Sequence, residues 1–181
     1  VASTGVIGMR LPMDRIGAGI EAAAKKLDPG AWGTVAKAIL TTDTKAKLVH
    51  VPGERFSLLG MAKGAGMIQP GMATMLAFIV TDLAAEPAFL DAALRDAIGP
   101  SLNSLTIDGE MSTSDMALVL ANGAAGGPAL EAGSQSPLAQ DFRKALRDLC
   151  DELAEKLAFD GEGVTRIARI HVRGAKNDRD A

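Results

Sequence analysis

The stretch KGAGMIQPGMATMLAFIVTD, residues 63–82, joins a glycine-rich loop to a strongly apolar run. Its glycines allow backbone conformations that other residues rarely adopt, and the apolar run from 75 to 80 is typical of a buried strand. Lys63 opens the loop, and Thr74 stands directly before the strand. A loop that only connects two elements does not need a charged residue here. The pattern therefore indicates a reactive site in a loop whose backbone takes an unusual conformation.

Three helices are expected around this stretch, because apolar residues recur there at three- and four-residue spacing. They cover residues 11–27, 87–98 and 137–159. A fourth, shorter helix is expected to follow Ser112–Asp115, whose hydroxyl groups and carboxylate can cap it, and to end at Asn122-Gly123.

Strands are expected between these helices, because short apolar segments recur there. The segments are 6–7, 48–51, 56–61, 75–81 and 105–108. Residues 164–173 give the clearest pattern, since apolar and polar side chains alternate as in a strand with one buried face. Helices separated by strands, some paired and some joined by crossovers, favour a layered α/β fold.

Composition excludes several classes of protein. A net charge of −3 and 3% aromatic residues give no footprint for nucleic acid. The longest apolar run, 75–80, is too short to cross a bilayer, and residues 1–10 show no signal-peptide pattern. The single cysteine, Cys150, lies on a helical apolar stripe, which excludes a disulfide framework. We therefore expect a cytoplasmic protein without a nucleic-acid or membrane partner.

Histidine-based catalysis and zinc binding are not expected. The only two histidines, His50 and His171, each fall in a predicted strand, so neither a Ser-His-Asp nor a Cys-His arrangement has its parts. The glycine pattern at 17–19 lies inside a predicted helix, and Lys63-Gly64 lacks the spacing of a phosphate-binding loop. These features therefore leave a hydroxyl group as the candidate nucleophile.

Two acidic turns, Asp108-Gly109-Glu110 and Asp160-Gly161-Glu162, offer oxygen ligands to a divalent cation. Asp-Gly is also a common pair in surface turns, and that interpretation is favoured for at least one of them.

Thr74 can act as a nucleophile without histidine if the bond between Ala73 and Thr74 is cut. Its own α-amino group, with an ordinary pKa of about 8, would then serve as the general base. Lys63 could lower that pKa or neutralise a substrate carboxylate. An Ala-Thr step at the start of a strand is, by itself, more often only structural.

Six blocks of the sequence resemble the ornithine acetyltransferase family, also called the glutamate N-acetyltransferases of arginine biosynthesis. They occur in the family's order and are STGVIG (3–8), LPMD (11–14), LTTDT (40–44), AKGAGMIQPGMATML (62–76), IDGEMSTSD with LANG (107–115 and 120–123), and DGEGVTRI with HVRGA (160–167 and 171–175). The resemblance implies an α-β-β-α sandwich like that of the ornithine acetyltransferase and self-processing aminopeptidase superfamily.

The resemblance also implies self-cleavage between Ala73 and Thr74. Residues 1–73 would end an α subunit, 74–181 would begin a β subunit, and two of each would form a heterotetramer. Thr74 would take an acetyl group from N-acetylornithine and pass it to glutamate by a ping-pong mechanism. No cofactor is implied, although some members also use acetyl-CoA.

Further site residues follow from the matching blocks. Thr4 and Gly5 match the family's oxyanion-hole positions. The positions that bind substrate are Thr41, Lys63, Thr74 and Glu162. Lys63 would face the α-carboxylate of ornithine or glutamate, and Glu162 the α-ammonium of the amino acid. Asp108 and Glu110 are expected to be structural, and no metal is expected.

The sequence departs from the family in three places. Gly71 stands where many members have asparagine, and the loop 124–137 looks longer than usual. The family's leading segment has no counterpart here, nor has the C-terminal segment that supplies an asparagine and a hydroxyl residue. We therefore expect residues 1–181 to be a single catalytic-domain portion of a longer chain.

Two other functions stay open on the sequence. A self-processing amidase or aminopeptidase of similar fold would use Thr74 with water as acceptor, but Lys63 paired with Glu162 favours an amino acid as acceptor. A non-catalytic relative, or one recruited to secondary metabolism, would keep only binding or assembly duties.

Overall fold

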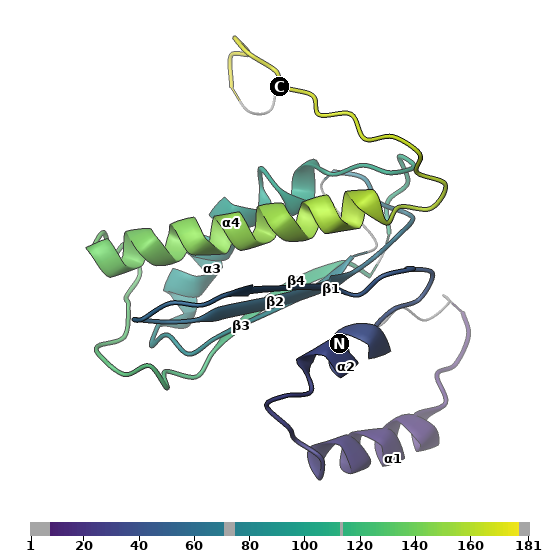
Figure 1. The fold of residues 1–181 in the computed structure, drawn as a ribbon, viewed down its shortest axis with the longest axis horizontal. Coiled ribbons are helices and arrows are strands. Elements are labelled where there is room, and N and C mark those ends of the chain that lie inside the picture. The colour runs from purple at the N-terminus through teal and green to yellow at the C-terminus, as the bar shows by residue number, and fades with distance from the viewer. Residues whose placement is uncertain (1–7, 71–74, 113, 178–181) are drawn as a thin grey trace.

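The computed structural model describes residues 8–70, 75–112 and 114–177, in which one four-stranded sheet lies between helices (Figure 1). The strands β1 (Lys47–Val51), β2 (Leu58–Lys63), β3 (Leu76–Thr81) and β4 (Met116–Ala121) lie in that order across the sheet. β1, β2 and β3 are antiparallel neighbours, whereas β3 and β4 are parallel. A parallel pair needs a crossover, and the segment containing α3 (Pro87–Ile98) and the 3-10 turn Leu102–Ser104 supplies it.

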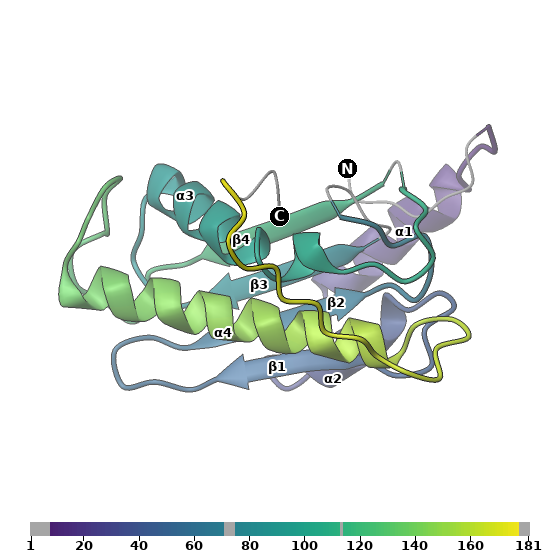
Figure 2. The same ribbon diagram turned by 90° about the horizontal axis from the view of Figure 1, so that it is seen from above.

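The helices α3 and α4 (Pro137–Phe159) cover one face of the sheet. Seen from above, α4 runs along β1 and β2 while α3 lies beside it (Figure 2). Gly60 in β2 allows α4 to come close, because a Cβ atom there would meet a Leu149 methyl group at 2.6 Å. Alternation along β2 therefore points Leu58 and Ala62 into the same core, where both are fully buried.

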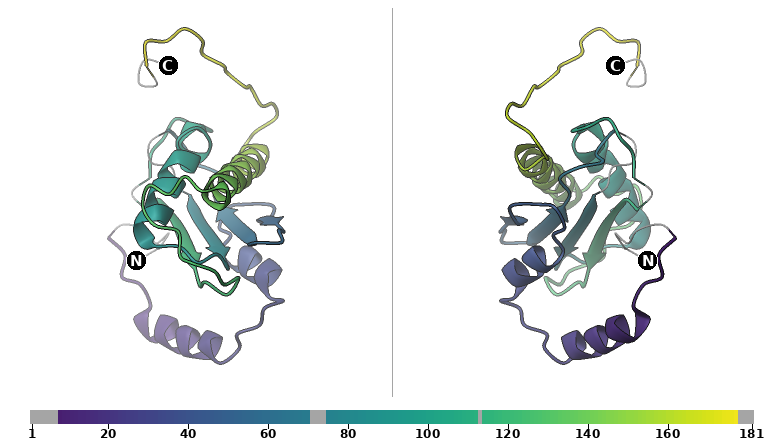
Figure 3. Two further views of the ribbon diagram at one scale, coloured as in Figure 1. Left: turned by 90° about the vertical axis from the view of Figure 1, so that its left-hand side faces the viewer. Right: turned by 90° about the vertical axis from the view of Figure 1, so that its right-hand side faces the viewer.

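The opposite face of the sheet carries Leu59, Met61 and Lys63 of β2, by the same alternation. Their register partners in β3 are Val80, Phe78 and Leu76. Among the described helices, α2 (Trp32–Ala38) is the one that packs near this face, against β1 and β2. α1 (Met13–Ala24) buries none of its residues and lies furthest from the sheet (Figure 3).

Two of the predicted helices have the predicted bounds, 87–98 and 137–159. α4 begins where the Ser136 hydroxyl accepts a hydrogen bond from the Ala139 amide at 3.2 Å, with Pro137 at the first helical position. α1 is shorter than the predicted helix 11–27 at both ends. The sequence pattern did not predict α2.

The helix expected between residues 112 and 123 is wrong, because Met116–Ala121 forms strand β4. Pairing with β3 in parallel register over six residues gives this segment backbone hydrogen bonds that a short isolated helix would otherwise have to supply. The expected capping group is used elsewhere, since the Asp115 carboxylate accepts from the amide of Met75 instead of capping a helix.

The strands expected at 164–173 and at 105–108 are also wrong. Residues 164–173 leave the body of the molecule after α4 in an extended form without strand pairing (Figure 1). The side chains of Ile170 and Val172, predicted to be buried, are 85% and 52% exposed. The expected strands 48–51, 56–61 and 75–81 correspond to β1, β2 and β3, while residues 6–7 lie outside the described residues.

The predicted α/β class is confirmed, and the described residues contain a single sheet. The two-sheet α-β-β-α layering therefore stays a prediction. No helix in the described part of the chain combines the length and apolarity needed to cross a membrane.

Candidate active site

A buried ammonium group, that of Lys47, links three distant parts of the chain at one end of the sheet. Lys47 is 1% exposed and lies in β1. It forms ion pairs with Asp43, in the loop before β1, and with Asp160, which ends α4, the latter at 2.5 Å. It also donates to the carbonyl oxygen of Gly64 at 3.4 Å. The ammonium group of Lys47 therefore connects the loop before β1, the end of α4 and the end of β2.

Asp43 connects this ion network to two blocks that were predicted to bind substrate. One carboxylate oxygen accepts from the amide of Gly64 at 2.6 Å, and the other accepts from the amide of Thr41 at 3.2 Å. Burial alone would raise the pKa of Asp43, but the hydrogen bonds from Gly64 and Lys47 hold it below the ordinary value. Asp43 is therefore ionised at neutral pH.

Asp160 closes the network from the far end of the sequence. Its carboxylate accepts from the amides of Thr44 and Lys45 at 3.0 and 3.1 Å, and from the Thr44 hydroxyl. Burial opposes ionisation, but the hydrogen bonds from Lys47, Thr44 and Lys45 outweigh it and lower the pKa to about 2. Of the two acidic turns, the one at 160–162 therefore begins with a structural carboxylate.

Lys63, the lysine singled out from the sequence, lies at the end of β2 and is 1% exposed. Its register partner is Leu76, two residues after Thr74. Burial lowers the pKa of Lys63, Asp43 and Asp115 oppose that shift, and Lys47 adds to it. The charges of two carboxylates and of a second lysine therefore act on the buried ammonium group of Lys63.

The other described candidates, Thr41 and Glu162, meet the same loop from different sides. Thr41 reaches it through Asp43, as described above. Glu162 donates its amide to the carbonyl of Ala65 at 2.7 Å, and its carboxylate lies against Gly66, where a Cβ atom would come within 3.1 Å. The structure thus gathers Thr41, Lys63 and Glu162 around residues 63–66. Their roles toward a substrate stay predictions.

Four predicted residues, Thr4, Gly5, Ala73 and Thr74, lie outside the described residues. Met75, which directly follows Thr74, is described and buried. Its amide donates to Asp115 at 2.9 Å, and its carbonyl accepts from the amide of Met116 at 3.0 Å. The chain leaving Thr74 is therefore fixed to the start of β4.

Asp108 holds the other end of the glycine-rich loop. Its carboxylate accepts from the amides of Met67 and Ile68, the latter at 3.0 Å, and from its own turn at Glu110. Met67 takes a positive φ of 51°, which a bulky residue adopts only when its surroundings impose it. These contacts agree with the structural role expected for Asp108.

The residues set aside from the sequence do not form a second centre. Cys150 is buried in α4, as predicted, and burial raises its pKa to about 12. His50 lies in β1, whereas His171 lies in the extended segment after α4, which corrects the strand predicted for it. Within the described ranges, no group of three or more His, Cys, Asp or Glu is arranged to hold a metal ion.

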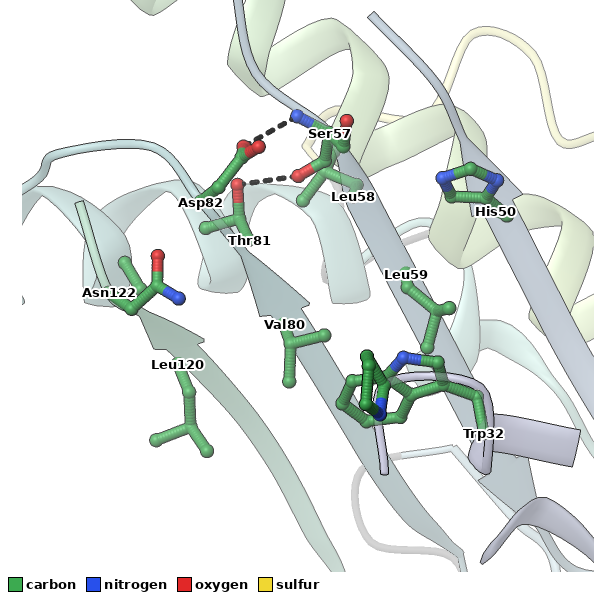
Figure 4. A pocket seen from close by; sticks show the side chains of 12 residues that line it. Trp32, His50, Ser57, Leu58, Leu59, Val80, Thr81, Asp82, Leu120 and Asn122 are labelled. Carbon is green, nitrogen blue, oxygen red and sulfur yellow. Dashed lines mark hydrogen bonds between the residues drawn. The ribbon is translucent and has the colours of Figure 1, made fainter. Parts of the chain in front are cut away.

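A pocket of about 600 Å³ lies at the opposite end of the sheet from Lys63 (Figure 4). Trp32, Leu59 and Val80 line its apolar part. Its carboxylate, Asp82, already accepts a hydrogen bond from the Ser57 amide at 2.7 Å. No lysine or arginine is among the residues that line the pocket. The pocket is therefore less suited to bind the carboxylate of an amino acid than the end of the sheet that carries Lys63.

Comparison with known proteins identifies the family of the whole chain, the segment around Lys63 included. All of residues 1–181 match the ArgJ family. The chain belongs to the ArgJ family. This confirms the resemblance that the six sequence blocks indicate.

Three members of the ArgJ family show how far the similarity extends. The arginine biosynthesis bifunctional protein ArgJ of Geobacter sulfurreducens is 46% identical over all of this chain and 47% of its own length. The protein of that name from Symbiobacterium thermophilum is 49% identical over 46% of its length. A glutamate N-acetyltransferase of Methanopyrus kandleri is 43% identical over 46% of its length. The chain thus spans about half the length of these relatives.

Replacing Lys47 by methionine is expected to destabilise the protein by about 3–5 kcal/mol, because Asp43 and Asp160 would stay buried without their cation. Chemical denaturation measures the change. The matched control is Arg55→Met, which breaks an ion pair with Asp141 whose side chains are 54% and 53% exposed. That change should cost at most about 1 kcal/mol. Equal losses in the two variants would contradict the structural role of Lys47.

Acid is expected to weaken the same network. The folded-state pKa of Asp160 is lowered, so its stabilising effect is fully present above the ordinary carboxyl pKa of about 4. It is lost as pH falls toward about 2. Urea unfolding measured from pH 6 downward should show the loss, on the order of 2 kcal/mol for this carboxylate. Asp160→Asn should flatten the profile, and an unchanged pH slope in that variant would show that Asp160 is not responsible.

Proposed function

We propose that this protein transfers an acetyl group from N-acetylornithine to glutamate through an acetyl ester on Thr74. One observation supports the proposal most strongly. Lys63 is buried at the end of β2, where the charges of Asp43 and Asp115 act on its ammonium group, and its register partner in β3, Leu76, follows Thr74 by two residues. Membership of the ArgJ family over the whole chain supports the same function.

The proposed reaction has two balanced halves. First, the Thr74 Oγ attacks the acetyl carbonyl carbon of N-acetylornithine, and the α-amino group of Thr74, freed by cleavage after Ala73, takes its proton. The amide C–N bond then breaks, and the departing amine of ornithine receives that proton. In the second half, the neutral amine of glutamate attacks the ester carbonyl carbon, and the α-amino group of Thr74 takes a proton from that amine. The ester C–O bond then breaks, and the departing Thr74 Oγ receives this proton, which restores the hydroxyl group.

Binding of an amino acid needs one group of each charge. In this proposal Lys63 meets the α-carboxylate of either substrate with a charge-assisted hydrogen bond. Glu162, on the other side of residues 64–66, meets the α-ammonium of released ornithine or of incoming glutamate, and Thr41 lines the same loop. The amides or hydroxyl of Thr4 and Gly5 would stabilise the oxyanion of each tetrahedral intermediate.

The proposal extends to the whole protein. The active form would contain two α chains ending at Ala73 and two β chains starting at Thr74, acting in the cytoplasm without a cofactor. The bifunctional names of several relatives suggest acetyl-CoA as a second acetyl donor. The competing hydrolase hypothesis predicts that ornithine release from N-acetylornithine does not depend on glutamate.

Replacing Thr74 by alanine is expected to abolish both self-cleavage and acetyl transfer, because the nucleophile is lost. Intact mass measures cleavage, and ornithine release with and without glutamate measures transfer. Thr34→Ala, on the exposed surface of α2, is the control and should behave as wild type. Full activity in Thr74→Ala would refute the proposal. Release of many equivalents of ornithine per enzyme without glutamate would favour the amidase, because the transferase stops after one.

Replacing Lys63 by methionine is expected to reduce kcat/KM for N-acetylornithine by about 10- to 100-fold, the effect of losing a charged hydrogen bond. The fold should persist, because methionine fills a similar volume without a charge to bury. Lys37→Met, on exposed α2, is the control. Unchanged kinetics in a folded Lys63→Met protein would remove Lys63 from the substrate site.

A further inference from the structure

Asp115 lies just before β4, and one of its carboxylate oxygens accepts a hydrogen bond from Met75, the residue that follows Thr74. Its Oδ1 accepts from the amide of Met75 at 2.9 Å, while the next residue, Met116, donates its amide to the Met75 carbonyl at 3.0 Å. Both backbone polar groups of Met75 are therefore engaged by two consecutive residues. A small displacement at this point would displace the residue next to the proposed nucleophile.

The second carboxylate oxygen of Asp115, Oδ2, differs from the first in its hydrogen bonding. Oδ2 is buried, and it has no hydrogen-bond partner within the part of the chain that the structure describes. A buried acceptor without a partner costs free energy, and a neutral residue here would avoid that cost. A carboxylate at this place therefore calls for a reason beyond the hydrogen bond to Met75, which an amide oxygen could accept as well.

The electrostatic surroundings of Lys63 suggest that reason. The charged groups acting on its ammonium are Asp43 from the loop before β1, Asp115 from the loop before β4, and Lys47 from β1. The two carboxylates favour the protonated lysine, whereas burial and Lys47 oppose it. Burial raises the pKa of Asp115 itself to about 6, while the Met75 amide and Lys63 lower it, so Asp115 is mainly ionised at neutral pH.

We propose that Asp115 is a positioning residue of the acetyl-transfer site, which fixes the main chain at Met75 and supplies a negative charge that acts on Lys63. The inference rests on the proposed function, because it assigns Lys63 to the substrate carboxylate. Asp115 itself touches no reacting atom in this account. It acts through Met75 on the position of Thr74, and through its charge on Lys63.

Two substitutions separate these roles. Asp115→Asn keeps an oxygen that can accept from the Met75 amide but removes the negative charge. Asp115→Ala removes both. The matched control is Asp82→Asn at the far end of the sheet, where a carboxylate likewise accepts one backbone hydrogen bond, from Ser57 at 2.7 Å.

The experiment measures the side-chain titration of Lys63 by NMR, together with the pH dependence of kcat and KM, in the four purified proteins. We expect the pKa of Lys63 to fall in Asp115→Asn, and KM for N-acetylornithine to rise at a lower pH than in wild type, with kcat largely kept. Asp115→Ala should in addition lose about 100-fold in kcat, because the chain beside Thr74 is no longer held. Asp82→Asn should titrate and react as wild type.

The outcomes are distinguishable from failure of the proposed function. An unchanged Lys63 titration in Asp115→Asn would overturn the electrostatic role, and equal kcat values in Asp115→Asn and Asp115→Ala would overturn the main-chain role. If the wild type transfers no acetyl group, the proposed function fails. A lowered Lys63 pKa in Asp115→Asn would still support the electrostatic role in that case.

Discussion

The ion network of Lys47 with Asp43 and Asp160 is the constraint on which the arrangement of the site depends. Two carboxylates and one ammonium leave water together, and such groups are strongly destabilising unless each has its partners. Here the network joins residues more than one hundred positions apart and fixes the end of α4 to the loop before β1. Because Asp43 also accepts from Gly64, the same charges set the backbone directly after Lys63.

Carboxylates hold the main chain at each side of the glycine-rich loop. Asp43 holds Gly64, Asp108 holds Met67 and Ile68, and Asp115 holds Met75. These carboxylates lie before β1 and before β4. The main chain is therefore held at three separate points, at Gly64, at Met67 with Ile68, and at Met75. A glycine-rich segment loses much conformational entropy when it is ordered, and charge-assisted hydrogen bonds to its backbone offset part of that loss.

The sequence predicted the helices 87–98 and 137–159 well, because their apolar stripes and terminators are local signals. It failed at β4, where partnership with β3 decides the structure, and at 164–173, whose alternation has no strand to pair with among the described residues. Lys63 was singled out from its place before the glycines, and its role toward a substrate stays a prediction. Lys47 and Asp115 were missed because their partners, Asp160 and Met75, are distant in sequence and no local spacing links them.

Detection of the acetyl-enzyme would test the central claim most directly. Purified protein is incubated with N-acetylornithine in the absence of glutamate, denatured in acid, and examined by mass spectrometry with peptide mapping. We predict that the fragment beginning at Thr74 gains the mass of one acetyl group on that residue and loses it when glutamate is added before denaturation. Ornithine release with no acetyl group on Thr74 at any time would contradict the covalent mechanism.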